Sequence, residues 1–173
     1  EIRTLSVVIV ITRLSDKLKF LTPHRIVKVL KEIGEITVRS SLTDYTFLVS
    51  DTILQNQMRL LEEVHLRQDV FYTSSRGVNE LNIVVSNSLN HLVEDYFEKE
   101  RLTQKAENLS SITVKLPAEN VSVPGIYYFI FQRLAWEGIV LYEVISTTNE
   151  FTILVDEDQV DRAFSVIKDL KSL

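Results

Sequence analysis

The sequence contains no cysteine and little glycine or proline, with four glycines and three prolines among 173 residues. A chain without cysteine forms no disulfides, holds no metal through thiolates and has no cysteine nucleophile. The few glycines form neither a phosphate-binding loop nor the tight turn around a nucleophilic serine. We therefore expect a protein that is not an enzyme and that needs no cofactor.

Long apolar runs are also missing, since no stretch approaches the roughly 20 residues of a membrane-spanning helix. A hydrophobic content of 45% with 25% charged residues is typical of a soluble globular protein. The net charge of -5 disfavours tight nonspecific binding to polyanions. Together with the lack of cysteine, these values predict a cytoplasmic protein with no membrane partner. The chain starts at Glu1 without a methionine or a signal segment, so we expect the ordered remainder of a longer polypeptide.

One pattern occurs twice in the chain. It reads "NELNIVVSNSLNHLVEDYF" from Asn79 and "NEFTILVDEDQVDRAFSVI" from Asn149. Each copy has a run of β-branched and aliphatic residues, a short polar junction and then apolar residues at helical spacing. The junctions, Ser86-Asn87-Ser88 and Asp156-Glu157-Asp158, carry side chains that suit a helix N-cap. Each copy therefore predicts a strand, a cap and an amphipathic helix.

The similarity extends upstream of both copies. A strand pattern, a helical pattern and a hairpin pattern precede each one. The order strand, helix, strand, strand, helix thus occurs over about residues 43–97 and again over about residues 110–170. This is the order of a ferredoxin-like α+β sandwich, one sheet with two helices on one face. The fourth strand is expected at residues 101–106 in the first copy and, for example, at "ITVRSS" near residue 36 for the second.

Several features of residues 110–173 occur together. Val123-Pro124-Gly125 opens the first helix, "EGI" closes it, the second strand ends in Ser-Thr, and the third strand runs into "FTILVDEDQVDRAF". In this combination they resemble an ACT domain, the small ligand-binding regulatory module of aspartokinase and many other enzymes and regulators of amino-acid metabolism. The first copy resembles the family in its hairpin and second helix, but it has Asp51-Thr52-Ile53 in place of the Pro-Gly opening. The whole chain resembles proteins that place a tandem ACT pair behind a helix-turn-helix-like segment.

The resemblance implies a division of the chain and a ligand site. We expect a basic helical segment in residues 1–42, with the remnant of a winged-helix domain as one interpretation of it. A first ACT-like domain is expected in residues 43–107 and a second ACT domain in residues 108–173, with the two sheets joined. ACT domains bind a small amino acid where the first strand turns into the first helix, often across an interface between two such domains. In the second copy the corresponding residues are Asn120, Val121, Ser122, Val123, Pro124, Gly125 and Ile126.

These residue types suit a carboxylate ligand. Pro124 sets φ for the first helical turn, and Gly125 lets a ligand approach the backbone without a Cβ in the way. The free N–H groups and partial positive charge of a helix start favour a carboxylate. Asn120 and Ser122 add side chains that form hydrogen bonds. The alternative is that Pro-Gly only starts a helix and that the loop before it is solvated.

Other candidate sites are weaker. Asp156-Glu157-Asp158 has oxygen ligands for a metal, but carboxylates gather at helix starts for capping reasons, and the first copy has Ser-Asn-Ser there. His24, His65 and His91 have no second ligand at helical spacing, so we expect surface side chains and no metal site.

The aromatic residues of "IYYFIFQRLAW" exceed what one face of a surface helix needs. We expect some of them to pack against the other copy or against a second chain in a homodimer. The alternative is a thick core within a single domain.

The N-terminal region differs from the rest in charge. "TPHRIVKVLKEIG" predicts a helix with Thr22 as cap, Pro23 in the first turn and Gly34 as terminator. The basic residues of the region are Arg13, Lys17, Lys19, Arg25, Lys28 and Lys31. Such asymmetry can accompany DNA binding, with a solvated basic face as the alternative.

We interpret the chain as a non-catalytic regulatory protein that binds a small amino acid and passes the signal on through dimerisation or through the N-terminal segment, with transcriptional regulation as one route. Two alternatives are a degenerate ACT pair that only dimerises and the detached regulatory part of an amino-acid kinase.

Overall fold

The computed structural model describes residues 24–173. The expectations for the chain before His24, including much of the helix-turn-helix-like segment, lie outside these residues. The helices are α2 (His24–Lys31), α3 (Ile53–His65), α4 (Asn90–Tyr96), α5 (Ile126–Trp136) and α6 (Val160–Asp169). The strands are β1 (Ile36–Leu48), β2 (Tyr72–Arg76), β3 (Glu80–Ser86), β4 (Leu102–Lys115), β5 (Glu143–Ser146) and β6 (Glu150–Asp156). Short 3₁₀ helices lie at Asn87–Leu89, Ala118–Ser122, Glu157–Gln159 and Leu170–Ser172. Among the helices of residues 24–173, none has the length and apolar character that crossing a membrane requires.

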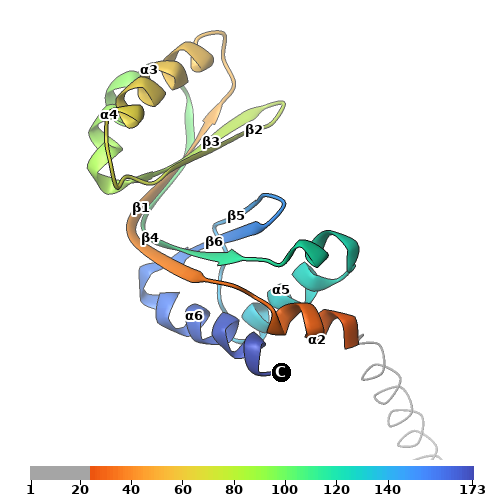
Figure 1. Ribbon diagram of the computed structural model, residues 1–173. Helices are drawn as coiled ribbons and strands as arrows, with labels where there is room; N and C mark the ends of the chain where they lie inside the picture. Colours follow the sequence, from red (N-terminus) through yellow and green to blue (C-terminus); the bar gives the residue numbers. More distant parts are fainter. Residues whose placement is uncertain (1–23) are drawn as a thin grey trace, which may run out of the picture.

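The strands form one antiparallel sheet in the order β2-β3-β1-β4-β6-β5 (Figure 1). The expected α+β fold is confirmed. The two central strands, β1 and β4, are unusually long, with 13 and 14 residues. The sheet curls along these strands, so that the chain forms two halves (Figure 1).

Each half has the order strand, helix, strand, strand, helix. The first half contains residues 42–48 of β1, then α3, β2, β3 and α4, and residues 102–106 of β4 complete its sheet beside β1. The second half contains residues 109–115 of β4, then α5, β5, β6 and α6. Here residues 36–39 of β1 pair with β4 in the position of a fourth strand. Each long strand therefore serves both halves, and position 42, the expected end of the N-terminal segment, lies inside β1.

The curl occurs where both long strands are irregular. Ser41 in β1 and Asn108 in β4 have φ values of 60° and 57°, in the left-handed region that few non-glycine residues adopt. The pairing of β1 with β4 also shifts register between Arg39 and Leu42. Irregularities of this kind bend a strand and increase its twist. They turn the uncovered faces of the two halves toward each other.

The core of the first half lies between the sheet and helices α3 and α4. Tyr45 and Phe47 of β1 stack with ring centroids 6.1 Å apart, and Phe47 stacks on Phe97 at 4.8 Å. Ile83 and Val85 of β3 are fully buried in the same cluster. These two residues are identical in the second copy of the repeat, where Ile153 and Val155 are also fully buried. The strand predicted for each copy of the repeat is therefore confirmed.

The second half has a larger core, and helix α2 belongs to it. Phe151 is fully buried and packs on Tyr127 and Phe131 with ring centroids 5.4 and 5.6 Å apart. The side chains of α2 and the turn after it that join this cluster are Ile26, Val29, Leu30 and Ile33. Helix α2 is thus part of the second half.

The aromatic residues of α5 divide between core and surface. Tyr127, Phe129 and Phe131 pack against the core of the second half. Tyr128 and Trp136 are 68% and 72% exposed. Packing within the second half therefore accounts for Tyr127, Phe129 and Phe131. The expected contact of Tyr128 and Trp136 with a second chain stays a prediction.

The N-caps expected after β3 and β6 are wrong. At both places the chain enters a 3₁₀ turn, and no side chain caps this turn or the helix that follows. Ser86 instead uses its hydroxyl oxygen to accept a hydrogen bond from the backbone N–H of Phe71, at 2.8 Å. The Ser86 side chain, which the local pattern predicts as a helix cap, is therefore engaged in a tertiary hydrogen bond.

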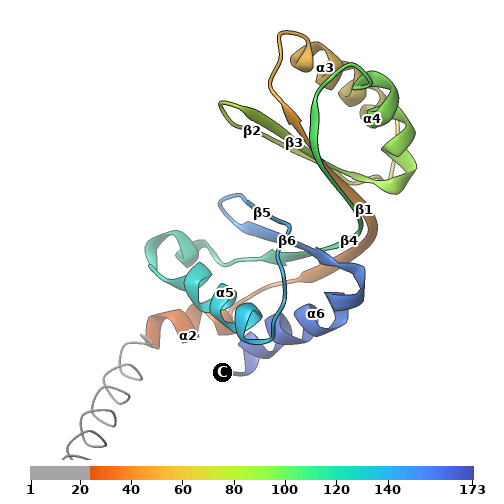
Figure 2. The same ribbon diagram turned by 180° about the vertical axis from the view of Figure 1, so that it is seen from behind.

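The helices lie on the outside of the curl, and the β2–β3 and β5–β6 hairpins face each other across its inside (Figures 1 and 2). Where the two halves meet, a small apolar cluster is formed by Leu42, Val84, Leu109 and Leu154. We call the side of the sheet that carries this cluster the inner face.

Candidate functional site

The residues that the sequence predicts as a ligand site lie between β4 and α5. Asn120 is buried, and its Nδ2 donates hydrogen bonds to the carbonyl oxygens of Pro117 at 2.9 Å and Thr148 at 2.8 Å. The Ser122 hydroxyl donates to the Glu119 carbonyl at 2.9 Å. The donors of both side chains are therefore engaged by backbone carbonyls, and Asn120 ties the loop to the β5–β6 turn.

The backbone at the start of α5 differs in one point from the expectation, because α5 begins at Ile126 and Pro124 lies in the turn before the helix. Gly125 has φ of +94° and directly precedes α5, and no side chain caps the helix. Pro124 is exposed and Ile126 is buried in the core. A Cβ added to Gly125 would lie 3.2 Å from Cδ1 of Ile26. Helix α2 therefore lies directly against the predicted site, and Ile26 occupies the space beside Gly125 through which a ligand was expected to approach the backbone.

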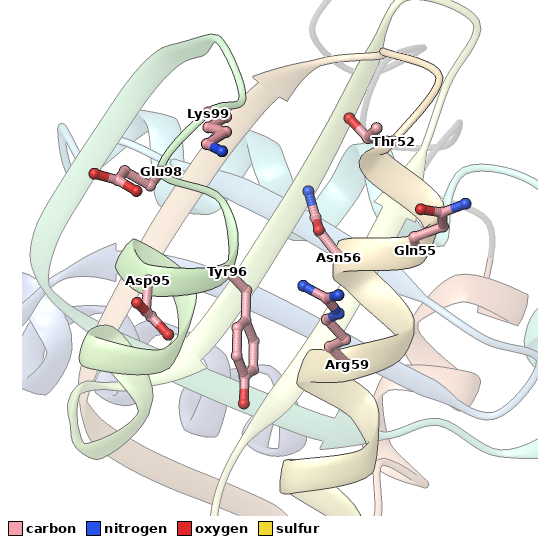
Figure 3. Close-up of a pocket in the computed structure, with 8 residues that line it drawn as sticks. All are labelled: Thr52, Gln55, Asn56, Arg59, Asp95, Tyr96, Glu98 and Lys99. Carbon is pink, nitrogen blue, oxygen red and sulfur yellow. The ribbon is translucent and has the colours of Figure 1, made fainter.

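A second candidate is a groove between α3 and α4, which the sequence analysis missed (Figure 3). Its volume is ≈ 470 Å³, within the usual range of small-molecule pockets. The lining residues are Thr52, Gln55, Asn56, Arg59, Asp95, Tyr96, Glu98 and Lys99. They come from two segments that the sequence separates widely, so no local motif marks them.

A carboxylate fixes one end of this groove. Glu100 accepts hydrogen bonds from the hydroxyls of Ser50 at 2.6 Å and Thr52 at 2.7 Å, and from Nδ2 of Asn56 at 2.7 Å. These donors lie at the start of α3, where the helix dipole also favours a negative charge. The network holds the segment after α4 against α3 and so positions Lys99.

The groove presents charges of both signs. Figure 3 shows Asn56 and Arg59 extending from α3 toward α4, with Tyr96 between the helices and Asp95 on the α4 side. The ion pairs found within residues 24–173 include neither Arg59 nor Lys99. An arginine guanidinium binds a carboxylate through two parallel hydrogen bonds, and a carboxylate binds an ammonium group. The groove therefore offers partners for both ends of a zwitterion.

A buried carboxylate stands apart from both candidates. Asp44 on the inner face of β1 is 3% exposed and accepts a hydrogen bond from Nδ2 of Asn82 at 2.6 Å. The pKa of Asp44 is raised to about 6: burial is the main cause, the hydrogen bond from Asn82 acts in the opposite direction, and the nearby Glu143 carboxylate adds to the increase. Because the folded pKa lies above the unfolded value of 3.8, stability falls as pH rises between these two values and then levels off.

The Asp44→Asn variant is therefore expected to be more stable than the parent by about 1–3 kcal/mol at pH values above about 7, and close to it below about pH 4. An asparagine keeps an oxygen that can accept the hydrogen bond from Asn82 and removes the charge whose burial is costly. Urea unfolding over this pH range measures the difference. Asp95→Asn, at an exposed site, is the control. Equal stability gains at both ends of the pH range would contradict the raised pKa.

Solved structures with the same fold are found among aspartate kinases. The aspartate kinase from Synechocystis matches with a TM-score of 0.66 and 14% identity, over 82% of this chain and 27% of that one. The regulatory subunit of aspartate kinase from Thermus thermophilus, solved in its ligand-free form, matches with a TM-score of 0.61 and 8% identity, over 80% of this chain and 97% of that one. This is the fold of an aspartate kinase regulatory domain. Aspartokinase III from E. coli, solved in complex with lysine and aspartate, matches with a TM-score of 0.56 and 11% identity, over 81% of this chain and 32% of that one.

The chain spans about a third of the length of the whole aspartate kinases that it matches. No family model and no curated protein matches the sequence. The ferredoxin-like α+β fold expected from the sequence is thus confirmed, and the structures named above share it. The tandem ACT pair, the homodimer and the DNA-binding segment stay predictions.

Proposed function

We propose that this chain is a regulatory module that binds a small amino acid and has no catalytic activity of its own. The observation that carries the proposal is the α3–α4 groove, which offers Arg59 and Asp95 as partners for the two charged groups of an amino acid. The fold adds support, because it matches the regulatory subunit of an aspartate kinase. It also matches aspartokinase III from E. coli, which was solved with lysine and aspartate.

In this proposal the ligand carboxylate binds Arg59, with Lys99 close by, and the ligand ammonium group binds Asp95. Asn56 and the hydroxyl of Tyr96 supply further polar contacts. All four charged residues that line the groove are exposed, so water and salt screen these contacts. We therefore expect weak binding, with Kd between about 1 mM and about 1 μM, which corresponds to about −4 to −8 kcal/mol.

At least one of the twenty amino acids is expected to raise the thermal unfolding midpoint of the chain at millimolar concentration. A ligand at about 100 times its Kd stabilises the folded state by about 2.7 kcal/mol. Arg59→Gln is expected to abolish the shift, because the amide has no charge to pair with a carboxylate. Arg67→Gln is the matched control, since Arg67 follows α3 and lies outside the groove. No shift with any amino acid would contradict the proposal.

The start of α5 is the second candidate for the amino-acid site, with the seven residues Asn120 to Ile126 expected from the sequence. The left-handed Gly125 and the uncapped helix start favour it. Val121→Asp separates the two candidates, because Val121 is 70% exposed and a carboxylate there would repel an anionic group at the helix start. If the ligand binds in the groove, Arg59→Gln weakens its binding and Val121→Asp does not. If the ligand binds at the start of α5, Val121→Asp weakens its binding and Arg59→Gln does not.

The regulated partner is the finer part of the proposal. The match to regulatory parts of aspartate kinases favours an amino-acid kinase as the regulated partner, in the same polypeptide or in a separate one. A homodimer is favoured by the exposed Tyr128 and Trp136 on α5. Transcriptional regulation through DNA has no counterpart among the matching structures named above, and we leave it out of the proposal.

A further inference from the structure

A cavity of ≈ 320 Å³ lies between the two hairpins on the inner face of the sheet. Its walls come from both halves of the chain, because the curl brings the β2–β3 and β5–β6 hairpins to the same side (Figures 1 and 2). The lining residues are Thr73, Ser74, Ser75 and Asn82 from the first half and Glu143, Val144, Ile145 and Ser146 from the second. Its volume is at the lower end of the range for small-molecule pockets.

The cavity presents hydrogen-bond acceptors and negative charge. Asn82 uses its Nδ2 to donate to Asp44 at 2.6 Å and to Thr46 at 3.3 Å, which leaves its Oδ1 as an acceptor. Glu143 adds a half-buried carboxylate, and the hydroxyl groups of the wall accept as well as donate. No lysine or arginine lines the cavity.

Asp44 lies beneath Asn82 and adds a second negative charge to this region. Glu143 on β5 is the charged group that acts on it from the facing half. On the neighbouring strand β4, the residue paired with Asp44 is the uncharged Ala106. Lys105, next along β4, points to the other side of the sheet and binds Glu94 at 3.0 Å. Within residues 24–173, therefore, no cationic side chain neutralises Asp44.

We propose that this cavity binds the ammonium group of a small organic amine, with Glu143 and the Oδ1 of Asn82 as its direct partners and Asp44 beneath them. An ammonium group supplies three hydrogen-bond donors for these acceptors. It also supplies the positive charge that the cavity walls lack. A metal ion is disfavoured, because residues 24–173 contain no group of three or more ligating His, Asp or Glu side chains. The amine holds the two hairpins together and so stabilises the curled arrangement of the sheet.

This site is independent of the amino-acid site. The groove between α3 and α4 needs a carboxylate on its ligand, whereas the cavity has no cation to bind one. The two proposals therefore have different ligands and different variants. Loss of amino-acid binding in Arg59→Gln should leave amine binding intact, so the failure of one proposal leaves the other standing.

The test is isothermal titration of the full chain with ethanolamine and with 1,4-diaminobutane, at about pH 8 and at about pH 5. We expect at least one amine to bind at about pH 8 and to bind about tenfold more weakly at about pH 5, where Asp44 is protonated. Glu143→Gln and Asp44→Asn are each expected to weaken binding at least about tenfold at the higher pH. Glu80→Gln, a change of the same kind on an exposed residue of the β2–β3 hairpin outside the cavity, should leave it unchanged.

Several results would overturn the proposal. One is the absence of binding by both amines up to about 10 mM at the higher pH. Another is binding that Glu143→Gln and Glu80→Gln weaken equally, which would indicate general charge attraction. Binding of calcium or potassium ions in place of either amine would assign the cavity to a metal. Circular dichroism on each variant checks that a lost signal does not come from a lost fold.

Discussion

Replacing Leu30 with alanine is expected to destabilise the whole chain by about 2–5 kcal/mol, the usual cost of removing a large buried aliphatic side chain. Leu30 lies in α2, has no exposed surface and belongs to the core cluster of the second half. Truncation leaves a cavity among side chains from α2, the sheet and the helices of that half. The measurement is the urea unfolding midpoint, with the slope of the transition unchanged.

Lys31→Ala is the matched control for this experiment, since Lys31 is the next residue of the same helix and is exposed. Its effect is expected to stay within about 0.5 kcal/mol. If Leu30→Ala were as mild as Lys31→Ala, α2 would not be part of the core. In that case the packing of α2 beside Gly125 would not couple the start of α5 to the N-terminal segment.

Replacing Phe47 with alanine in the first half is expected to lower the free energy of unfolding that Trp136 reports in the second half by about 3–5 kcal/mol. Phe47 is 3% exposed and stacks on Tyr45 and Phe97. Trp136 is the only tryptophan of the chain and lies at the end of α5. The two halves share β1 and β4, so loss of one half removes a strand from the sheet of the other.

Tryptophan fluorescence and far-ultraviolet circular dichroism, followed during urea unfolding, measure this coupling. Coincident transitions are the sign of a single cooperative unit. Phe151 is the fully buried aromatic residue of the second half. Phe151→Ala should lower the midpoints of both transitions, by fluorescence and by circular dichroism, by a similar amount. If Phe47→Ala does not change the midpoint of the fluorescence transition, the two halves unfold separately.

Much of the local structure was predictable from sequence, because it follows from short-range patterns. The apolar runs of the repeat predict β3 and β6, and Ile83, Val85, Ile153 and Val155 of these strands lie in the cores. The Pro-Gly pair correctly marks the start of α5, since a left-handed Gly125 is a local backbone requirement. Helix caps were less predictable, because Ser86 has a tertiary partner in Phe71 that no local pattern contains.

The candidate sites show the same limit. The loop from Asn120 to Ile126 is contiguous, so a motif can mark it. The engagement of the Asn120 amide by Pro117 and Thr148 depends on the fold around the loop. The α3–α4 groove and the inner-face cavity are built from residues distant in the chain, and neither has a sequence signature.

The sequence by itself determined the element order, its repetition and the α+β class, because hydrophobic periodicity and turn chemistry act over a few residues. The sequence also offered the segment near residue 36 as the fourth strand of the second half, and the pairing of residues 36–39 with β4 confirms it. Only the tertiary structure decided that α2 enters the core of the second half and that the two halves meet at the apolar cluster of the inner face. These features depend on which segments pair across long stretches of chain. That pairing is set by the burial of whole faces, and no single segment encodes it.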